Sequence, residues 1–572
     1  MYKIFGIFLS LLFTVQLTLH ADWTKSLGTL QKSESVKKSY LIGMLTERSY
    51  GIYKVEKLES KQTVLALYEK NGNSLYWFDD AKILSSNIPD MIEAIKRSAN
   101  EGLDPNRYHL QDIEFIYKKM LNSMLFDDRD YNLSATKLDI LLSDAFLTLA
   151  KDLSQSQINY TAFQNILYKK SEKEGINYFW EKRVHQYNYI DLLDGAHSSG
   201  QLIDTLYALT PTNEIYNTLK DAYKRYKSIE SQGGFQKIST DKNLKFGSVS
   251  KTVVELRVRL GQSGDLDFSH ENNTTFDETV KDGVKRFQKR VGLWPSGILN
   301  STTRKALNVS IEKRLEIIKL NLERSRWESD SFDYKYIIVN IPEFMMRFMD
   351  HDQQLLNARV IVGRLKNPTP IFQSNMSYIV LNPRWSVPNS IIVKEMLGRI
   401  QEDPYYLEDR NYKMYDGWSR KYRKEVDAFD VDWFKYDDES KLPFNIVQEP
   451  GVRNPLGNVK FMFPNNHAVY MHDTPTKKLF KKSVRAFSHG CIRLHNPQKL
   501  LEFISDSYLG SPYTIIKSKL DTGENQTLSL NQKIPIYVRY YTAFVDERGG
   551  VNFSKDIYGY DKIHHKLLQK NN

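Results

Sequence analysis

The chain has 572 residues, enough for several domains, and it is 41% hydrophobic and 26% charged. This balance is typical of a folded globular protein and excludes a disordered chain or a protein with many membrane spans. The formal net charge of +11 favours polyanionic partners such as nucleic acid, anionic lipid or a carboxylate-rich cell wall. The sequence contains no nucleic-acid-binding motif and no long basic run, so we expect no nucleic-acid partner.

Residues 1–21 predict a secretory signal peptide. A short basic start precedes an apolar run over residues 4–19, and the small residue Ala21 follows it. The run is short for a transmembrane helix. We therefore expect export, with an uncleaved signal that anchors the protein in the membrane as the alternative.

Residues 22–240 read as a mainly helical scaffold domain. Apolar residues recur near the 3.6-residue period within 88–95, 135–153 and 216–226. No group of residues in this region has a spacing that suggests catalysis. We expect these helices to support the rest of the chain.

Residues 241–310 predict a compact unit of three helices, over 249–260, over 276–291 and from Ser301 as the N-cap. The motif VKRFQ at 284–288, followed by Gly-Leu, Gly297 and the T…LN pattern at 303–308, resembles the small peptidoglycan-binding module. The resemblance implies that this unit attaches the protein to the cell wall. A further amphipathic helix within 311–330 is expected to connect it to the next domain.

From residue 331 the pattern changes to β-strands, and we expect a mostly-β domain over 331–525. Runs rich in β-forming residues occupy 336–341, 344–349, 358–363 and 377–382. A hairpin is predicted around Asn465 and Asn466, with this pair in a left-handed turn. Strands in the tail, 526–572, are expected to rejoin the sheet. The predicted fold class is therefore multidomain α+β.

An insertion is predicted at about 395–450. This stretch is dense in charged and aromatic residues and has no clear strand pattern. It would act as a lid over the site or as a surface decoration without a part in binding.

The chemistry is predicted at Cys491, the only cysteine of the chain. It lies after Gly490 in a polar loop, a setting that favours a reactive thiol over a buried inert one. Because a free thiol has a pKa of about 8.5, it needs a base, and His472 stands at the end of a predicted strand. The backbone N–H groups of Gly490 and Cys491 would bind an oxyanion, with glycine required for close backbone approach.

The motif His472-Asp473-Thr-Pro, together with Ser488-His489-Gly490-Cys491-Ile-Arg493, resembles the signature of the L,D-transpeptidases. The order of the predicted domains is similar to that of the large periplasmic subgroup of this family. The resemblance implies a periplasmic enzyme of peptidoglycan biosynthesis and cell-wall organisation, with a role in cell shape.

The resemblance also implies roles for single residues. Cys491 would be the nucleophile and His472 the general base and acid. The backbone carbonyl of Asp473 would orient His472, with its carboxylate as the alternative, and Tyr470 would assist at the oxyanion.

The remaining predicted site residues surround this centre. Ser488 and His489 would shape the nucleophile loop, although His489 has a purely structural alternative. Arg493 would brace the loop or hold a substrate carboxylate. Three residues resemble the wall of the family's substrate cleft: Trp385, Asn389 and Ser390.

By resemblance, the enzyme cleaves D-alanine from a tetrapeptide stem and transfers the acyl group to the diaminopimelate side-chain amine of a neighbouring stem. Carbapenem-type β-lactams are expected to acylate the same thiol. Hydrolysis would make the enzyme an L,D-carboxypeptidase, and a non-catalytic peptidoglycan-binding scaffold is a further alternative. A zinc site is the last rival, but its histidines lack the usual ligand spacing, and we expect neither metal nor cofactor. Its candidate ligands are His467, His472, His489, Cys491 and His495.

Overall fold

The computed structural model describes most of the chain between residues 35 and 571. The predicted signal peptide lies outside the described residues. No helix among those residues combines the length and apolar character needed to cross a bilayer. The described ranges are 35–46, 53–55, 57–78, 85–122, 127–176, 178–182, 186–239, 242–267, 272–328, 332–351, 353–417, 424–438 and 442–571.

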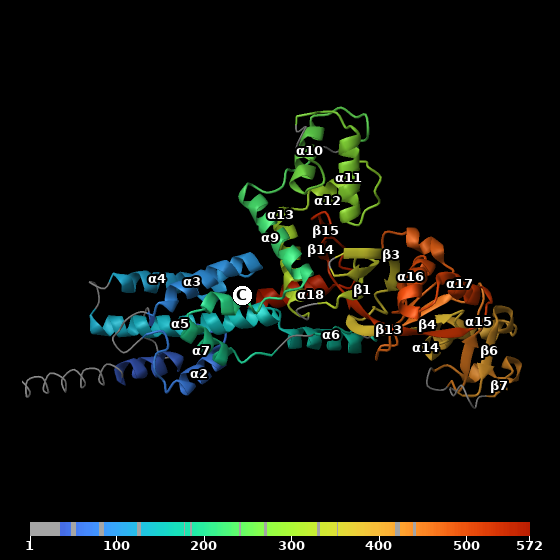
Figure 1. Ribbon diagram of the computed structural model, residues 1–572, viewed down its shortest axis with the longest axis horizontal. Helices are drawn as coiled ribbons and strands as arrows, with labels where there is room; N and C mark the ends of the chain where they lie inside the picture. Colours follow the sequence, from blue (N-terminus) through green and yellow to red (C-terminus); the bar gives the residue numbers. More distant parts are fainter. Residues whose placement is uncertain are drawn as a thin grey trace, which may run out of the picture.

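The predicted fold class is confirmed, because a helical region, a three-helix unit and a mostly-β region follow one another along the chain (Figure 1). In the helical region, the long α5 lies at the centre and buries most of its residues. Asp127 caps α5 by accepting a hydrogen bond from the backbone of Asp130. The helices of this region are α2 (Lys61–Lys70), α3 (Asn87–Arg97), α4 (Leu110–Leu121), α5 (Asp128–Gln155), α7 (Tyr189–Ser199) and α8 (Leu202–Tyr207).

One segment of the predicted scaffold domain belongs to another core. Helix α6 (Tyr160–Glu174) and the residues after it pack into the hydrophobic core of the large sheet, where Phe163 and Trp180 are buried. Trp180 also forms a bridge with Ile371 of that region. The helical region therefore reaches into the mostly-β domain.

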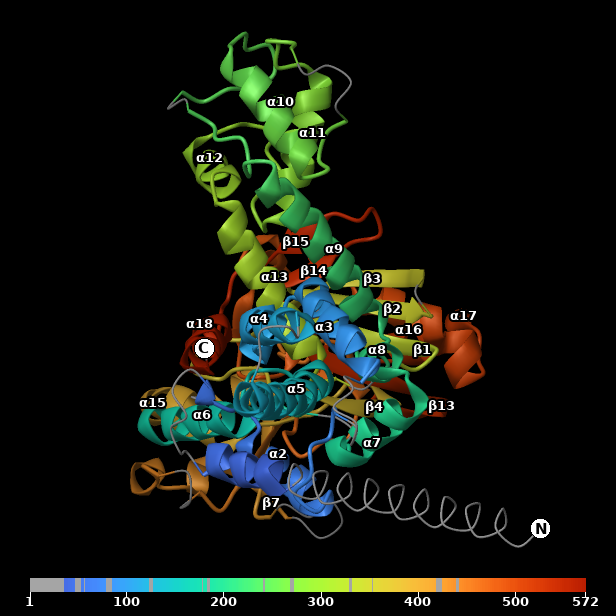
Figure 2. The same ribbon diagram turned by 90° about the vertical axis from the view of Figure 1, so that its left-hand side faces the viewer.

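The three-helix unit has its own core and consists of α10 (Thr252–Gln262), α11 (Glu278–Arg290) and α12 (Ser301–Leu307). The cap of α12 is Asn300, whose side chain accepts from Thr303, so the predicted cap at Ser301 is wrong by one residue. The flanking helices α9 (Glu214–Ser231) and α13 (Ile311–Ser325) pack against each other. Figure 2 shows the unit standing out from the body above this helix pair.

A nine-stranded sheet forms the mostly-β region, in the order β11-β3-β12-β10-β9-β4-β13-β1-β2. Strand β2 also pairs with β3, so the sheet closes on itself. The predicted return of the C-terminal tail is confirmed by β13, which lies between β4 and β1. The strands are β1 (Lys335–Asn340), β2 (Met345–Asp350), β3 (Gln353–Gly363), β4 (Phe372–Leu381), β9 (Val459–Met462), β10 (Met471–His472), β11 (Ala486–Ser488), β12 (Ile492–Leu494) and β13 (Gln526–Arg539).

Helices and a small hairpin complete this region. Helix α16 follows β12 and packs its apolar face into the sheet core, while α18 packs against α6 and α13. The hairpin of β14 and β15 packs on α9 and α13. These elements are α16 (Pro497–Ile504), the π-helix η12 (Ser505–Leu509), α17 (Tyr513–Asp521), β14 (Ala543–Val545), β15 (Val551–Phe553) and α18 (Tyr560–Asn571).

The insertion is a folded unit with a sheet of its own, although its sequence shows no clear strand pattern, and it begins at Trp385 rather than at about 395. Its four short strands pair in the order β5-β8-β6-β7 and share a hydrophobic core with the helices before them. The strand pattern was hidden because these strands have two to four residues each. The elements are β5 (Trp385–Ser386), α14 (Asn389–Ile391), the π-helix η6 (Ile392–Met396), α15 (Leu397–Glu402), β6 (Tyr412–Tyr415), β7 (Glu425–Val426) and β8 (Asn445–Gln448).

The predicted hairpin between β9 and β10 is present, but its turn differs from the prediction. The left-handed residue is Ala468, with φ of 53°, and not the Asn465–Asn466 pair. The Asn465 side chain instead binds backbone groups across the turn, donating to Phe463 and Val469 at 2.7 Å each. A side chain, rather than a left-handed asparagine, therefore shapes this turn.

Candidate active site

The site lies where β10 and β12 run parallel, with His472 beside Arg493. On one face of these strands, Met471 and Ile492 point into the core and are fully buried. Because side chains alternate along a strand, His472 and Arg493 lie on the opposite face. Lys460 of β9 pairs with His472 and joins the same face. The sheet thus brings the side chains of His472, Arg493 and Lys460 together on one surface.

Cys491 stands immediately before β12 and faces Tyr470, which stands immediately before β10. The Ile492 N–H donates to the Tyr470 carbonyl at 3.0 Å, which holds the two segments in register. The thiol is partly exposed and lies within hydrogen-bonding reach of the Tyr470 hydroxyl. The Tyr470 ring lies 5.5 Å from the His472 ring, centre to centre. Tyr470 therefore adjoins both the predicted nucleophile and the predicted base.

The proton on His472 can be assigned from its partner. The ring is buried, and its Nδ1 lies 2.5 Å from the backbone carbonyl of Asp473. A carbonyl oxygen only accepts hydrogen bonds, so Nδ1 carries the proton and Nε2 keeps its lone pair. The Asp473 carboxylate is held elsewhere, by Lys477 and by the Asn458 N–H. The backbone of Asp473, and not its carboxylate, orients the imidazole.

The surroundings keep His472 neutral. Burial lowers the pKa of His472 to about 3, and the charge of Arg493 acts in the same direction, as do Lys460 and Lys477. The hydrogen bond to the Asp473 carbonyl opposes this shift but does not outweigh burial. At neutral pH the ring is therefore an unprotonated base.

The thiol is also neutral at rest. Burial raises the pKa of the Cys491 thiol, while hydrogen bonds from Tyr470 and the charges of Lys460 and Arg493 act to lower it. The raised pKa of the thiol and the lowered pKa of His472 both favour the neutral forms over a thiolate–imidazolium pair. Attack by the thiol then requires proton removal during the reaction, and nearby cations stabilise the negative charge that results.

The nucleophile loop is held by Ser488. Its hydroxyl donates to the Cys491 carbonyl at 2.5 Å and accepts from the Gly490 N–H at 3.2 Å. Thr369 donates to the Gly490 carbonyl at 2.8 Å. The predicted oxyanion donors are the N–H groups of Gly490 and Cys491. Because the Gly490 N–H already donates to Ser488, the Cys491 N–H is the remaining candidate of the two.

Glycine is needed at 490 for its backbone conformation. Gly490 has φ of +115°, which side chains rarely tolerate. A Cβ there would meet only the Pro368 carbonyl, at 3.9 Å, which is ordinary contact. Within the protein itself, the backbone conformation rather than a lack of room requires glycine, and close approach to a substrate remains a prediction.

The two other predicted loop residues make different contacts. Arg493 is half-buried and donates from Nη1 to the Thr476 hydroxyl at 3.2 Å, a bracing contact. His489 is exposed, and its Nε2 lies 2.7 Å from the Glu395 carboxylate of the insertion. Sequence reasoning missed Glu395 because the stretch around it carried no recognisable pattern. It also missed Lys460, although the hairpin register places it opposite His472.

The predicted cleft residues all lie in the insertion. Trp385 belongs to β5 and packs on the core of the insertion, 6.5 Å from the Tyr412 ring. Asn389 and Ser390 begin α14. Their contact with substrate remains a prediction.

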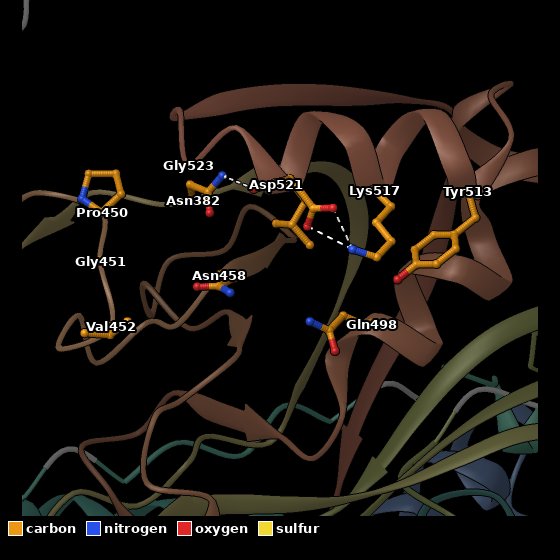
Figure 3. Close-up of a pocket in the computed structure, with 11 residues that line it drawn as sticks. Asn382, Pro450, Gly451, Val452, Asn458, Gln498, Tyr513, Lys517, Asp521 and Gly523 are labelled. Atoms are coloured by element: carbon orange, nitrogen blue, oxygen red, sulfur yellow. Dashed lines mark hydrogen bonds and ion pairs between the residues drawn. The ribbon is translucent and has the colours of Figure 1, made fainter.

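A pocket of about 490 Å³ lies near the start of β9, and Cys491 is not among the residues that line it (Figure 3). Its wall on α17 carries the ion pair of Lys517 and Asp521, at 2.6 Å. Asn458, which also lines it, holds the Asp473 carboxylate through its N–H. The lining residues are Asn382, Pro450, Gly451, Val452, Asn458, Gln498, Tyr513, Lys517, Leu520, Asp521 and Gly523.

The histidines of the alternative zinc site do not gather in one place. His467 packs on Phe179, with ring centres 4.2 Å apart, and His495 packs on Phe480 at 5.0 Å. In the described part of the chain, no three His, Cys, Asp or Glu residues lie close enough together to hold a metal ion.

Comparison with known proteins identifies three domain families. Residues 334–515 match the YkuD L,D-transpeptidase catalytic domain, residues 62–222 a scaffold domain and residues 250–307 a peptidoglycan-binding domain. A curated relative named "Putative L,D-transpeptidase", from Haemophilus influenzae, is 31% identical over 245 residues. This match covers 43% of the chain and 48% of the relative, so the chain spans about half the length of the curated relative it matches.

Solved structures show more distant likeness. An L,D-transpeptidase from Mycobacterium smegmatis is 14% identical, over 36% of this chain and 60% of that one, with a TM-score of 0.18. An L,D-transpeptidase from Xylanimonas cellulosilytica is 11% identical, over 53% of this chain and 99% of that one, with a TM-score of 0.17. TM-scores this low carry no structural argument about the chain.

Proposed function

Because the chain contains an L,D-transpeptidase catalytic domain together with scaffold and peptidoglycan-binding domains, we propose that it crosslinks peptidoglycan outside the cytoplasm. The observation that carries this proposal is the arrangement around Tyr470. A neutral imidazole with a free Nε2 and a neutral thiol adjoin the same phenol ring. This arrangement suits acyl transfer through a thioester.

In the first half-reaction, His472 Nε2 removes the proton from Cys491 Sγ. The sulfur attacks the carbonyl between the third stem residue and D-alanine, and a carbon–sulfur bond forms. The negative charge on oxygen is stabilised by the Cys491 N–H and by the Tyr470 hydroxyl. The carbon–nitrogen bond then breaks, and His472 returns the proton to the amine of the departing D-alanine.

In the second half-reaction, the side-chain amine of diaminopimelate on a neighbouring stem attacks the thioester. An amide bond forms, the thiol leaves, and the proton lost by the amine passes through His472 to sulfur. Water in place of the amine would yield a trimmed tripeptide, which is the carboxypeptidase alternative. The peptidoglycan-binding domain would keep the enzyme on the wall while both stems are engaged.

β-Lactams would report on the first half-reaction alone. One matched solved structure is an L,D-transpeptidase in complex with imipenem. We propose that imipenem acylates Cys491 in this protein, adding its full mass to the chain.

The proposal is tested with peptidoglycan rich in tetrapeptide stems. After incubation with the protein and digestion to muropeptides, mass analysis should show dimers linked between two third-position residues, and free D-alanine. Tripeptides without dimers would establish the carboxypeptidase instead. The Cys491→Ala variant should fold and bind the wall, because one small loop residue replaces another. It should leave the muropeptide profile of the substrate unchanged, because it lacks the thiol. Equal profiles for parent and variant would leave only the non-catalytic scaffold.

A further inference from the structure

Three charged or titratable side chains meet beside the nucleophile loop. His489 Nε2 lies 2.7 Å from Glu395 Oε1 and 2.6 Å from Arg364 Nη2. The Arg364 guanidinium is also 3.4 Å from the Glu395 carboxylate. All three side chains are partly exposed. Of the three, only His489 is predicted from the sequence to shape the nucleophile loop, and Arg364 and Glu395 have no predicted role.

Each corner of the triangle comes from a different segment. Arg364 follows β3, and its N–H donates to the Ser488 carbonyl at 3.0 Å, which fastens it to the nucleophile loop. Its Nε also donates to Asn367 at 2.9 Å. Glu395 belongs to the π-helix η6 of the insertion. The contact between Glu395 and His489 therefore joins the insertion to the loop that carries Cys491.

The two neighbours of His489 compete for one ring nitrogen. A bare Nε2 can accept from Arg364 but cannot bind a carboxylate. An Nε2 that carries a proton can donate to Glu395 but cannot accept from Arg364. The proton on this nitrogen thus selects whether His489 binds Glu395 directly or binds Arg364, which pairs with Glu395 in turn.

His489 is separated from Cys491 by one residue. Gly490 has φ of +115°, and its carbonyl accepts a hydrogen bond from Thr369 at 2.8 Å, which holds the peptide before the thiol. On the far side, Ser488 anchors the loop through the Gly490 N–H and the Cys491 carbonyl. Because these hydrogen bonds join residues 488–491 into one loop, a change in the place of His489 would shift the loop that carries the sulfur.

We propose that Glu395 is a positioning residue, which closes the insertion onto the nucleophile loop through His489 and so sets the place of the Cys491 thiol. This rests on the proposed function, since it assumes that Cys491 is the reacting group. A π-helix at this point fits the role, because such one-turn irregularities often occur at functional sites. Glu395 itself does not touch substrate.

The test is the rate of Cys491 acylation by imipenem, followed by mass, in the full-length protein. Glu395→Ala should slow acylation about five-fold, the effect of losing an exposed ion pair of ordinary strength. Glu395→Gln should retain most of the rate because the amide oxygen still accepts from Nε2–H. As a matched control, Glu425→Ala removes the insertion's exposed pair with Lys413, whose atoms lie 3.3 Å apart, and should leave the rate unchanged.

A double substitution separates positioning from general support of the fold. If Glu395 acts through His489, Glu395→Ala should have no further effect in a His489→Ala background. Independent effects of the two substitutions, or a parent rate in Glu395→Ala, would overturn the proposal. If the parent is not acylated at Cys491, the proposed function is overturned, and the positioning role with it. If the parent and Glu395→Ala are acylated at equal rates, only the positioning role is overturned.

Discussion

At the scale of single residues, the site is governed by the balance between burial and positive charge. Burial keeps His472 unprotonated and Cys491 protonated, and Lys460 and Arg493 act with burial on the imidazole but against it on the thiol. Lys460 also lies over the Tyr470 ring, 3.7 Å from its centre. The cations therefore favour the charge that appears on sulfur during attack, while the resting site remains neutral.

The lowered pKa of His472 predicts how the rate of Cys491 acylation depends on pH. Since an ordinary histidine has a pKa of about 6.5 and His472 one of about 3, the base form persists far into the acid range. Acylation by imipenem should therefore stay nearly constant as the pH falls from about 7 to about 5, and should decline only on approach to about 3. Initial rates measured by mass across this range check it. A decline with a midpoint near 6.5 would contradict the assignment.

At the scale of elements, short turns hold the groups that orient the base. Gly457 precedes β9 with φ of +59°, and the Asp473 carboxylate packs directly against its Cα. Asn458, the next residue, donates its N–H to the same carboxylate at 3.1 Å. The turn thereby fixes Asp473, whose carbonyl in turn fixes the ring of His472.

Gly457→Ala should slow acylation more than a comparable substitution elsewhere. An added Cβ would lie 2.3 Å from Asp473 Oδ2, so Asp473 must move and its carbonyl with it. Gly523→Ala is the matched control, because Gly523 has φ of +75° and nothing within 4 Å of a new Cβ. Both variants should lose about 1–3 kcal/mol of stability from backbone strain. Equal acylation rates in the two would show that the turn does not orient His472.

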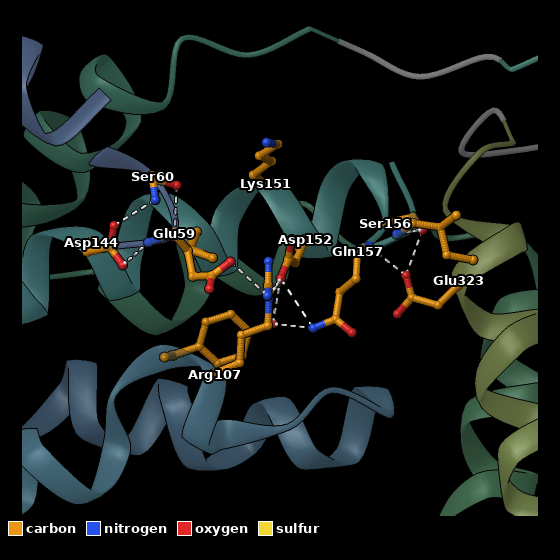
Figure 4. Close-up of polar contacts among 12 residues, drawn as sticks. Glu59, Ser60, Arg107, Asp144, Lys151, Asp152, Ser156, Gln157 and Glu323 are labelled. Carbon is orange, nitrogen blue, oxygen red and sulfur yellow. Dashed lines mark hydrogen bonds and ion pairs between the residues drawn. The ribbon is translucent and has the colours of Figure 1, made fainter. Parts of the chain in front are cut away.

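At the scale of the whole molecule, buried polar contacts join the helical region to α13, the helix that leads into the catalytic domain. Glu323 of α13 accepts hydrogen bonds from Ser156, at 2.6 Å, and from the Gln157 backbone, at 2.7 Å, both at the end of α5 (Figure 4). It also pairs with the fully buried Arg326, at 2.7 Å. Arg326 further donates to the Glu101 carbonyl at 2.6 Å. The helical region and α13 are thus joined by a buried ion pair, in which each charge compensates the other.

Arg326→Met should destabilise the protein strongly. The substitution keeps much of the volume but leaves the Glu323 carboxylate buried without its cation, which costs about 3–5 kcal/mol. Urea unfolding of parent and variant measures this loss. Lys413→Met, which breaks an exposed pair, is the control and should cost less than about 1 kcal/mol. Similar losses for both would mean that the junction does not depend on the buried charge.

Local patterns made much of the molecule predictable. The strands near 336–341 and 377–382 appear where runs of β-forming residues indicated them, because strand formation depends in part on residues close in sequence. The motif around Cys491 predicts the proposed chemistry from the sequence alone. Single capping and turn residues were less predictable. Asn300 caps the helix in place of Ser301, and Ala468 takes the left-handed conformation in place of the asparagine pair. In each case, neighbouring residues can fill the position at nearly equal free energy.

By itself, the sequence determined the α+β class, the order of the domains and the pairing of one thiol with one imidazole as the candidate centre. Only the tertiary structure decided that Trp180 packs in the sheet core, that Lys460 faces His472, and that Glu395 reaches the nucleophile loop. The physical reason is distance along the chain. Helix and strand propensities act over a few residues, whereas these contacts arise when strand register and core packing bring remote segments together.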